Sequence, residues 1–135
     1  MKRLFLDANV LFTAAHNPDG KAAFIVALGA EGMWNLFTSA FAVEEARRNL
    51  IAKYPAAVGR FHEFLRSIAL VSERPDAPFP DDLVKKDRPV FQAAYACKAT
   101  HLITGDIVHF GTYMMNPGKA PGIAVMTPAQ FLDSL

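Results

Sequence analysis

The stretch LFLDANVL, residues 4–11, decides how the rest of the sequence is read. Its first three residues form a short continuous apolar run, which is too short for an amphipathic helix and is typical of a buried strand. The run ends at Asp7, a carboxylate placed where the backbone leaves the strand. The stretch therefore predicts a buried strand with an acidic residue at its carboxyl end.

The segments that follow alternate between helical and extended patterns. In the first two predicted helices, the spacing assigns Phe24 and Phe41 to apolar stripes that face a core, and Ser39 is expected to cap the second helix. Such alternation predicts an α/β domain, a three-layer α/β/α sandwich with a mostly parallel central sheet. The further predicted strands are 33–38, 68–72, 101–104 and 122–127, and the predicted helices are 21–32, 39–54, 56–67, 88–97 and 128–135.

Length and composition exclude several classes of protein. A chain of 135 residues predicts one domain, 1–135, and a single cysteine, Cys97, cannot form an internal disulfide. Fourteen basic and 13 acidic residues give a net charge of +1, which excludes a strongly basic protein that coats nucleic acid. Asp7 and Asn9 interrupt the apolar run that a signal peptide would need, and no run is long enough to span a membrane. We therefore expect a cytoplasmic protein without a membrane segment.

Acidic residues occupy informative positions. Asp7 and Asp106 each follow a predicted strand, and ligands of open α/β sheets bind outside the carboxyl ends of the strands. Two more acids lie near helix starts that face this edge, Asp87 and one of Glu44 and Glu45. Converging carboxylates repel one another unless a cation lies between them, and Mg²⁺ prefers oxygen ligands. The pattern predicts a divalent metal site suited to phosphoryl chemistry, since the zinc and phosphate-loop motifs are both missing.

Four segments, in this order and spacing, resemble the PIN-domain nucleases. The closing GIAVMTPAQFL also matches the way such domains often end, so the resemblance covers nearly the whole chain. The four segments are LFLDANVL (4–11), SAFAVEEARRNL (39–50), DRPVFQAA (87–94) and LITGDIVHF (102–110).

The resemblance implies a VapC-like ribonuclease that depends on Mg²⁺ or Mn²⁺. Small stand-alone members of the family resemble the toxin half of a toxin–antitoxin pair, which implies an RNA substrate, an antitoxin partner and a homodimer. Glu45 fits the position of the second acid better than Glu44 does, because an apolar residue follows it and Leu50 lies five positions on. The implied catalytic and metal-binding residues are Asp7, Glu45, Asp87 and Asp106, with Asn9 and Thr104 in support.

One departure from the family concerns the residues after the fourth acid. Many relatives carry a further Asp three or four residues later, whereas this chain has Ile107, Val108, His109 and Phe110 there. His109 could assist the acids or could be structural, and either one or two metal ions remain possible.

Each candidate residue also has a structural interpretation. Asp87 could serve only as a helix N-cap, and Glu45 could belong to a solvated helix face. Basic side chains beside the acids could neutralise an RNA backbone or simply be solvated. These RNA-binding candidates are Arg47, Arg48, Lys85 and Arg88.

Two other functions compete with the nuclease. A haloacid-dehalogenase-like phosphatase would also place an Asp at the end of the first strand, and Phe37-Thr38-Ser39 could pass for its hydroxyl motif, although Asn9 stands where that family has its second Asp. A non-catalytic interaction module would retain the acids without a reaction. Cleavage of RNA, or a phospho-enzyme on Asp7, would distinguish the two enzymes.

Overall fold

A computed structural model describes residues 1–114, 116 and 118–135, and its centre is a sheet of five parallel strands. The strands lie in the order β3-β2-β1-β4-β5, so β1 is the middle strand. Their bounds are β1 Arg3–Leu6, β2 Asn35–Ser39, β3 Ala69–Val71, β4 His101–Ile103 and β5 Ala124–Met126. The predicted α/β class is confirmed, and each strand pair is parallel.

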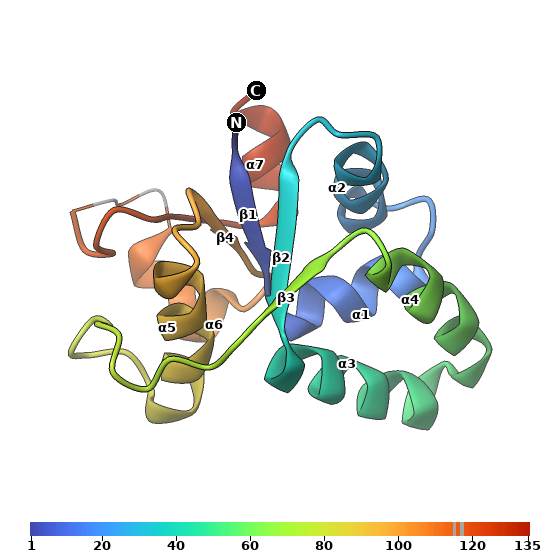
Figure 1. The fold of residues 1–135 in the computed structure, drawn as a ribbon, viewed down its shortest axis with the longest axis horizontal. Coiled ribbons are helices and arrows are strands. Elements are labelled where there is room, and N and C mark those ends of the chain that lie inside the picture. Colours follow the sequence, from blue (N-terminus) through green and yellow to red (C-terminus); the bar gives the residue numbers. More distant parts are fainter. Residues whose placement is uncertain (115, 117) are drawn as a thin grey trace.

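Helices cover both faces of this sheet, which makes the three layers (Figure 1). The helices α1 to α4 lie on one side, with α7 packed against α2, and α5 and α6 lie on the other. No helix among the described residues is both long and apolar enough to cross a membrane. The helix bounds are α1 Ala8–His16, α2 Lys21–Ala30, α3 Ala40–Lys53, α4 Val58–Leu65, α5 Arg88–Ala96, α6 Ile107–Phe110 and α7 Pro128–Asp133, with short 3₁₀ turns η1 Pro55–Ala57, η2 Lys85–Asp87 and η3 Gly111–Tyr113.

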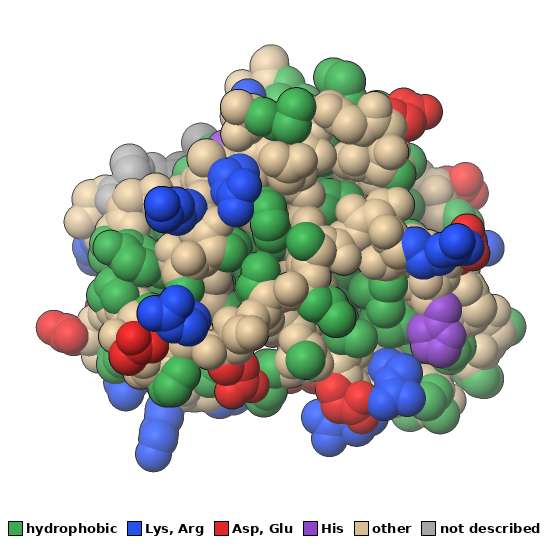
Figure 2. All heavy atoms as spheres, viewed as in Figure 1, with side chains coloured by type: hydrophobic (Ala, Val, Ile, Leu, Met, Phe, Trp, Pro, Cys, Tyr) green, Lys and Arg blue, Asp and Glu red, His purple; other side chains and the backbone are tan. Residues whose placement is uncertain are grey.

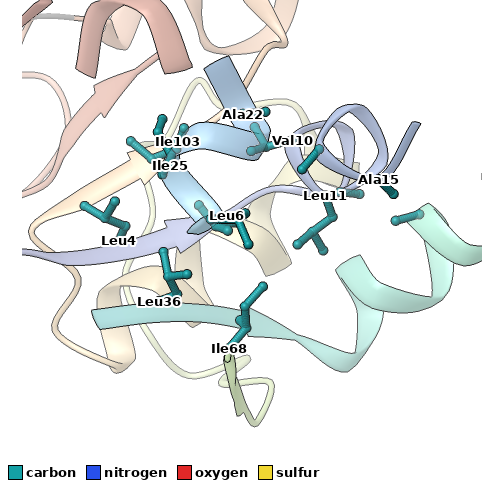
Figure 3. Close-up of a cluster of buried hydrophobic side chains, with 14 of the residues drawn as sticks. Leu4, Leu6, Val10, Leu11, Ala15, Ala22, Ile25, Leu36, Ile68 and Ile103 are labelled. Atoms are coloured by element: carbon teal, nitrogen blue, oxygen red, sulfur yellow. The ribbon is translucent and has the colours of Figure 1, made fainter. Parts of the chain in front are cut away.

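The middle strand β1 supplies side chains to both hydrophobic cores. Leu4 and Leu6 point into the core beneath α1 and α2, whereas Phe5 points into the core beneath α5. All three side chains are fully buried. Figure 3 shows Leu4 and Leu6 in the first core, near Ile103 of the neighbouring strand. Because both faces of β1 are buried, its carboxyl end is held firmly in the middle of the molecule.

The helices α6 and α1 are not among the predicted elements, since the sequence analysis places the first helix at residue 21 and none between residues 97 and 128. Helix α1 follows β1 directly. The residue that ends β1 also begins this helix, since the side chain of Asp7 accepts a hydrogen bond from the backbone of Ala8. Val10, Leu11 and Ala14 are buried at helical spacing, so the periodicity was present in the sequence. The strand therefore leads directly into a helix, with one acidic residue at the junction.

The predicted positions of two phenylalanines are wrong. Phe24 is 54% exposed and Phe41 is 41% exposed. Ile25 of α2 and Leu50 of α3 do face the core, together with the small residues Ala22, Ala42 and Ala46. Alanine side chains let a helix lie close to its neighbours, and close packing stabilises a protein interior. The other predicted elements occur with ends shifted by a few residues, and Ser39 caps α3 as expected.

Close packing gives a prediction about two glycines in helices. In Gly29→Ala, the new Cβ would lie 2.5 Å from a side-chain carbon of the buried Leu36, whereas at exposed Gly59 no atom lies within 4 Å of such a Cβ. Overpacking should therefore lower the free energy of unfolding of Gly29→Ala by about 1–3 kcal/mol. Gly59→Ala, the matched control, should raise it by up to about 1 kcal/mol through helix propensity. Urea unfolding measures both, and a stabilised Gly29→Ala would contradict the packing of α2 on β2.

Candidate active site

A buried carboxylate joins the carboxyl ends of β1 and β4. The Asp7 side chain belongs to a residue that is only 8% exposed. Its Oδ1 accepts the backbone N–H of Ala8 at 2.8 Å, and its Oδ2 accepts the Thr104 hydroxyl at 2.8 Å. The amide of Asn9 donates to the same Oδ2 at 3.2 Å. Three donors therefore hold this carboxylate in one position.

Asn9 and Thr104 bind the two strand ends to each other. Oδ1 of Asn9 accepts the backbone N–H of Gly105 at 2.7 Å, so the start of α1 is tied to the chain after β4. Oγ1 of Thr104 accepts the backbone N–H of Asp106 at 3.1 Å, and Thr104 is fully buried. Both residues therefore connect the end of β1 to the chain that follows β4.

The environment of Asp7 makes its charge unfavourable. Burial raises the pKa of this carboxyl from 3.8 to about 6, against the opposing effect of the hydrogen bonds from Thr104 and Ala8. The negative charges of Glu45 and Asp87 raise the pKa further. Glu45 and Asp87 therefore lie near enough to Asp7 to act on it, as the prediction of a shared acidic edge requires.

A second group of side chains lies beside the first. Nδ1 of His109 lies 2.6 Å from Oδ2 of Asp87 and 3.0 Å from Oδ2 of Asp106. Each of the three residues offers a donor atom within 4.8 Å of the others. Among the described residues, His109 is the one basic side chain that forms an ion pair with any of the four predicted acids.

The side chain of Asp87 caps no helix. Asp87 precedes α5, yet its carboxylate makes no capping hydrogen bond, so the simple N-cap interpretation does not describe this side chain. Burial raises the pKa of Asp87, the charge of His109 opposes that rise, and the charge of Asp106 adds to it. Asp106 does act as a cap, because its Oδ1 accepts the backbone N–H of His109 at 3.0 Å at the start of α6.

The four predicted acids share one edge of the sheet without meeting at a single point. Within the described part of the chain, the tight cluster contains Asp87, Asp106 and His109, while Asp7 and Glu45 lie outside it. His109 is thus the residue whose role the sequence left undecided. Its spacing of three from Asp106, within one turn of a helix, was the available signal.

The predicted RNA-binding residues differ in whether their side chains already have partners within the described chain. Arg47 forms an ion pair with Glu44 on the surface of α3, and both side chains are partly exposed. The guanidinium of Arg88 donates to the carbonyl of Leu83 at 2.9 Å and lies 4.6 Å from the centre of the Phe79 ring. Arg88 therefore holds the loop before α5 in place.

Exposed basic side chains nevertheless surround this edge. Arg48 and Lys85 are exposed, and no ion pair of either is found among the described residues. Figure 2 shows acidic and basic side chains along the lower rim of the molecule, at the end where β2 leads into α3 in Figure 1. Charges of both signs thus lie close together on this rim.

A cavity of about 650 Å³ adjoins the acidic edge. It shares Asn9, Gly105 and Asp106 with the network described above, and Lys21 lines it as well. Its volume falls within the range of ordinary small-ligand sites. The remaining lining residues are Val10, Thr13, Asn17, Gly20, Ala22, Thr127, Pro128 and Ala129.

Comparisons with known proteins agree with the observed fold. Residues 3–108, most of the chain, match the family described as the PIN domain. No curated protein matches the sequence. The fold is similar to that in a crystal structure of VapBC2 from Rickettsia felis bound to a DNA fragment from their promoter, with a TM-score of 0.67 and 14% identity over 93% of this chain and 98% of that one. At this identity the structural similarity shows the fold alone.

The raised pKa of Asp7 gives a prediction about stability. A pKa of about 6 in the folded chain, against 3.8 as the ordinary value, means that folding favours the protonated form. The ionised carboxylate therefore destabilises the fold above about pH 6, and the disadvantage disappears as the pH falls toward 4. Asp7→Asn should raise the free energy of unfolding at pH 8 in EDTA by up to about 3 kcal/mol, at about 1.4 kcal/mol per pKa unit.

Chemical unfolding across pH 4–8 measures this difference. The matched control is Asp133→Asn, which removes an exposed acid from α7 and should give no pH-dependent gain. An advantage of Asp7→Asn that grew on acidification would contradict the electrostatic interpretation of this site.

Proposed function

Because the chain belongs to the PIN-domain family of nucleases, we propose that it is a divalent-metal-dependent ribonuclease that hydrolyses phosphodiester bonds in RNA. The observation that carries the proposal is the gathering of acids at the carboxyl edge of a parallel sheet, with Asp7 nearly buried and no Lys or Arg paired to it among the described residues. Parallel sheets place their ligands at this edge.

The donor set fits a hard divalent cation. Carboxylate oxygens are the ligands that Mg²⁺ and Mn²⁺ prefer, and buried carboxylates with raised pKa values are stabilised by a nearby positive charge. Oδ2 of Asp87 is buried and makes no well-oriented hydrogen bond in the described structure, and its ion-pair contact with His109 is the one that a bound cation would replace or share. The proposed ligands are Asp7, Glu45, Asp87 and Asp106.

Some residues of the chain would bind the cation, and others would hold those ligands in position. A cation at this edge would polarise a phosphoryl oxygen and increase the acidity of water. Asn9 and Thr104 fix the orientation of Asp7 through the hydrogen bonds already described. Glu45 is exposed, so it can reach solvent or substrate without leaving a buried partner behind.

The phosphatase alternative finds little support in the side chains that it would need. The hydroxyl of Thr38 is fully buried and donates to the carbonyl of Leu6 at 2.8 Å. The hydroxyl of Ser39 accepts the backbone N–H of Ala42 at 3.1 Å as the cap of α3. Both hydroxyls of that motif are therefore committed to the fold.

RNA is the substrate that the surroundings favour. Exposed Arg48 and Lys85 can neutralise backbone phosphates beside the acids, while Arg47 and Arg88 would have to release partners within the chain. The adjoining cavity has room for part of a nucleotide, with Lys21 at its wall.

The proposed biological setting is a toxin–antitoxin pair. The family resemblance implies this setting, with a homodimer of the chain, a small antitoxin protein as partner and a cytoplasmic location. The fold similarity to VapBC2, which was solved bound to promoter DNA, supports an assembly of this kind. Co-expression with the product of the neighbouring reading frame, followed by size-exclusion chromatography, tests the partner.

Amide substitutions test the reaction. Asp87→Asn and Asp106→Asn should each lower the rate of RNA cleavage in Mn²⁺ by a factor of about 100 or more, because losing a ligand removes part of the several kcal/mol that a cation supplies. Gel analysis of a labelled RNA gives the rate, and EDTA should abolish cleavage by the unmodified protein.

Glu63→Gln is the matched control for these variants. It removes an exposed carboxylate of α4 that pairs with Arg66, away from the proposed ligands and RNA contacts, so cleavage should be unchanged. Full activity of Asp106→Asn, or cleavage that persists in EDTA, would contradict the metal-dependent mechanism. Hydrolysis of a phosphomonoester without RNA cleavage would favour the phosphatase.

Salt dependence tests the two exposed basic residues. Binding of single-stranded RNA, measured in the Asp106→Asn background, should weaken in Arg48→Ala and in Lys85→Ala. Each substitution should reduce the slope of log K against log salt by about 0.7, because one phosphate contact is lost. Lys2→Ala is the control, since exposed Lys2 precedes β1 at the opposite edge of the sheet. Equal effects of all three variants would show that the binding is not localised.

A further inference from the structure

The imidazole of His109 faces the acids with one ring nitrogen. Nδ1 lies 2.6 Å from Oδ2 of Asp87 and 3.0 Å from Oδ2 of Asp106, and the side chain is 23% exposed. The backbone N–H of His109 donates to Oδ1 of Asp106, which fixes the start of α6 and leaves Oδ2 of Asp106 facing the ring. The three donor atoms therefore converge from two segments of the chain, the end of η2 and the start of α6.

The side chains of Asp87 and His109 lie close together without forming a well-oriented hydrogen bond. Nδ1 of His109 and Oδ2 of Asp87 are both buried atoms, and neither makes a hydrogen bond of acceptable geometry although they lie 2.6 Å apart. Buried polar atoms in native proteins nearly always have partners, so a pair of this kind needs an explanation.

Adjacent ligands of one small cation have the spacing seen here. Bonds of about 2.0–2.2 Å to a six-coordinate ion place neighbouring donor atoms about 3 Å apart. The two distances from Nδ1 of His109 are 2.6 and 3.0 Å. Both distances are close to this spacing, and one donor atom from each of the three residues lies within 4.8 Å of the others, near enough to share one ion.

We propose that Nδ1 of His109 is a ligand of the divalent cation, together with the carboxylates of Asp87 and Asp106. The proposal rests on the proposed function and extends it, because it adds an imidazole to the carboxylate ligands. Imidazole suits transition-metal ions, whereas Mg²⁺ favours oxygen donors. The site should therefore discriminate against Mg²⁺ more strongly than a site made of carboxylates alone.

Pulsed EPR of the full chain with MnCl₂ tests the proposal directly. The spectrum of bound Mn²⁺ should show coupling to a histidine nitrogen, and ¹⁵N-histidine labelling should change that coupling. His109→Gln should remove the coupling and weaken Mn²⁺ binding by about tenfold or more in calorimetry. His62→Gln, which removes an exposed imidazole from α4, should change neither.

A second variant separates ligand identity from structural damage. His109→Asp should still bind a cation, without nitrogen coupling, and its ratio of Co²⁺ to Mg²⁺ affinity should fall below that of the unmodified protein. An unchanged ratio, or coupling that persists in His109→Gln, would overturn the assignment of His109.

The outcomes also separate this proposal from the proposed function. Mn²⁺ binding without histidine coupling would leave the carboxylate site and the nuclease intact, and would mean that His109 only forms ion pairs with the acids. Failure of the unmodified chain to bind Mn²⁺ would overturn both the metal site and the role of His109.

Discussion

The buried carboxylate of Asp7 is the constraint on which the rest of the molecule depends. One of its oxygens caps α1, and the other accepts a hydrogen bond from Thr104 after β4. A single side chain thus connects the central strand to a helix and to the neighbouring strand. Burial and two nearby acids make its charge unfavourable. The residue that organises the edge of the sheet therefore also carries the most unfavourable charge there.

The edge itself was predictable because parallel strands finish at the same side of a sheet. Asp7 and Asp106 could be assigned to it from the apolar runs that precede them. Side-chain partners could not be assigned in this way, since they depend on the path of loops. The loop before α5 commits Arg88 to the carbonyl of Leu83, and a short helix turns His109 toward Asp87.

The helix faces show a different limit of sequence interpretation. Large apolar residues were assumed to mark the buried stripe, yet Phe24 and Phe41 are partly exposed. The close approach of α3 to α1 is set by Ala42 and Ala46, which carry little hydrophobic signal of their own. Where small residues determine how near two elements come, hydrophobicity predicts the helix and part of its inner face, such as Leu50, but it also assigns to that face residues that lie partly exposed.

The division of the site into two groups connects stability with metal affinity. Asp7 is fixed by the sheet, whereas Asp87 ends the 3₁₀ turn η2 and Asp106 caps the short helix α6. Burial, with a smaller contribution from repulsion by neighbouring acids, raises the pKa of both Asp7 and Asp87 and so opposes folding when they are ionised. A cation that binds only the folded chain removes this unfavourable electrostatic energy. The free energy that the ionised carboxylates cost the fold is recovered when the ion binds, and so it contributes to the affinity for the ion. The free energy of unfolding and the metal affinity therefore depend on the same electrostatic interaction. A substitution at these acids that raises the free energy of unfolding should lower the metal affinity.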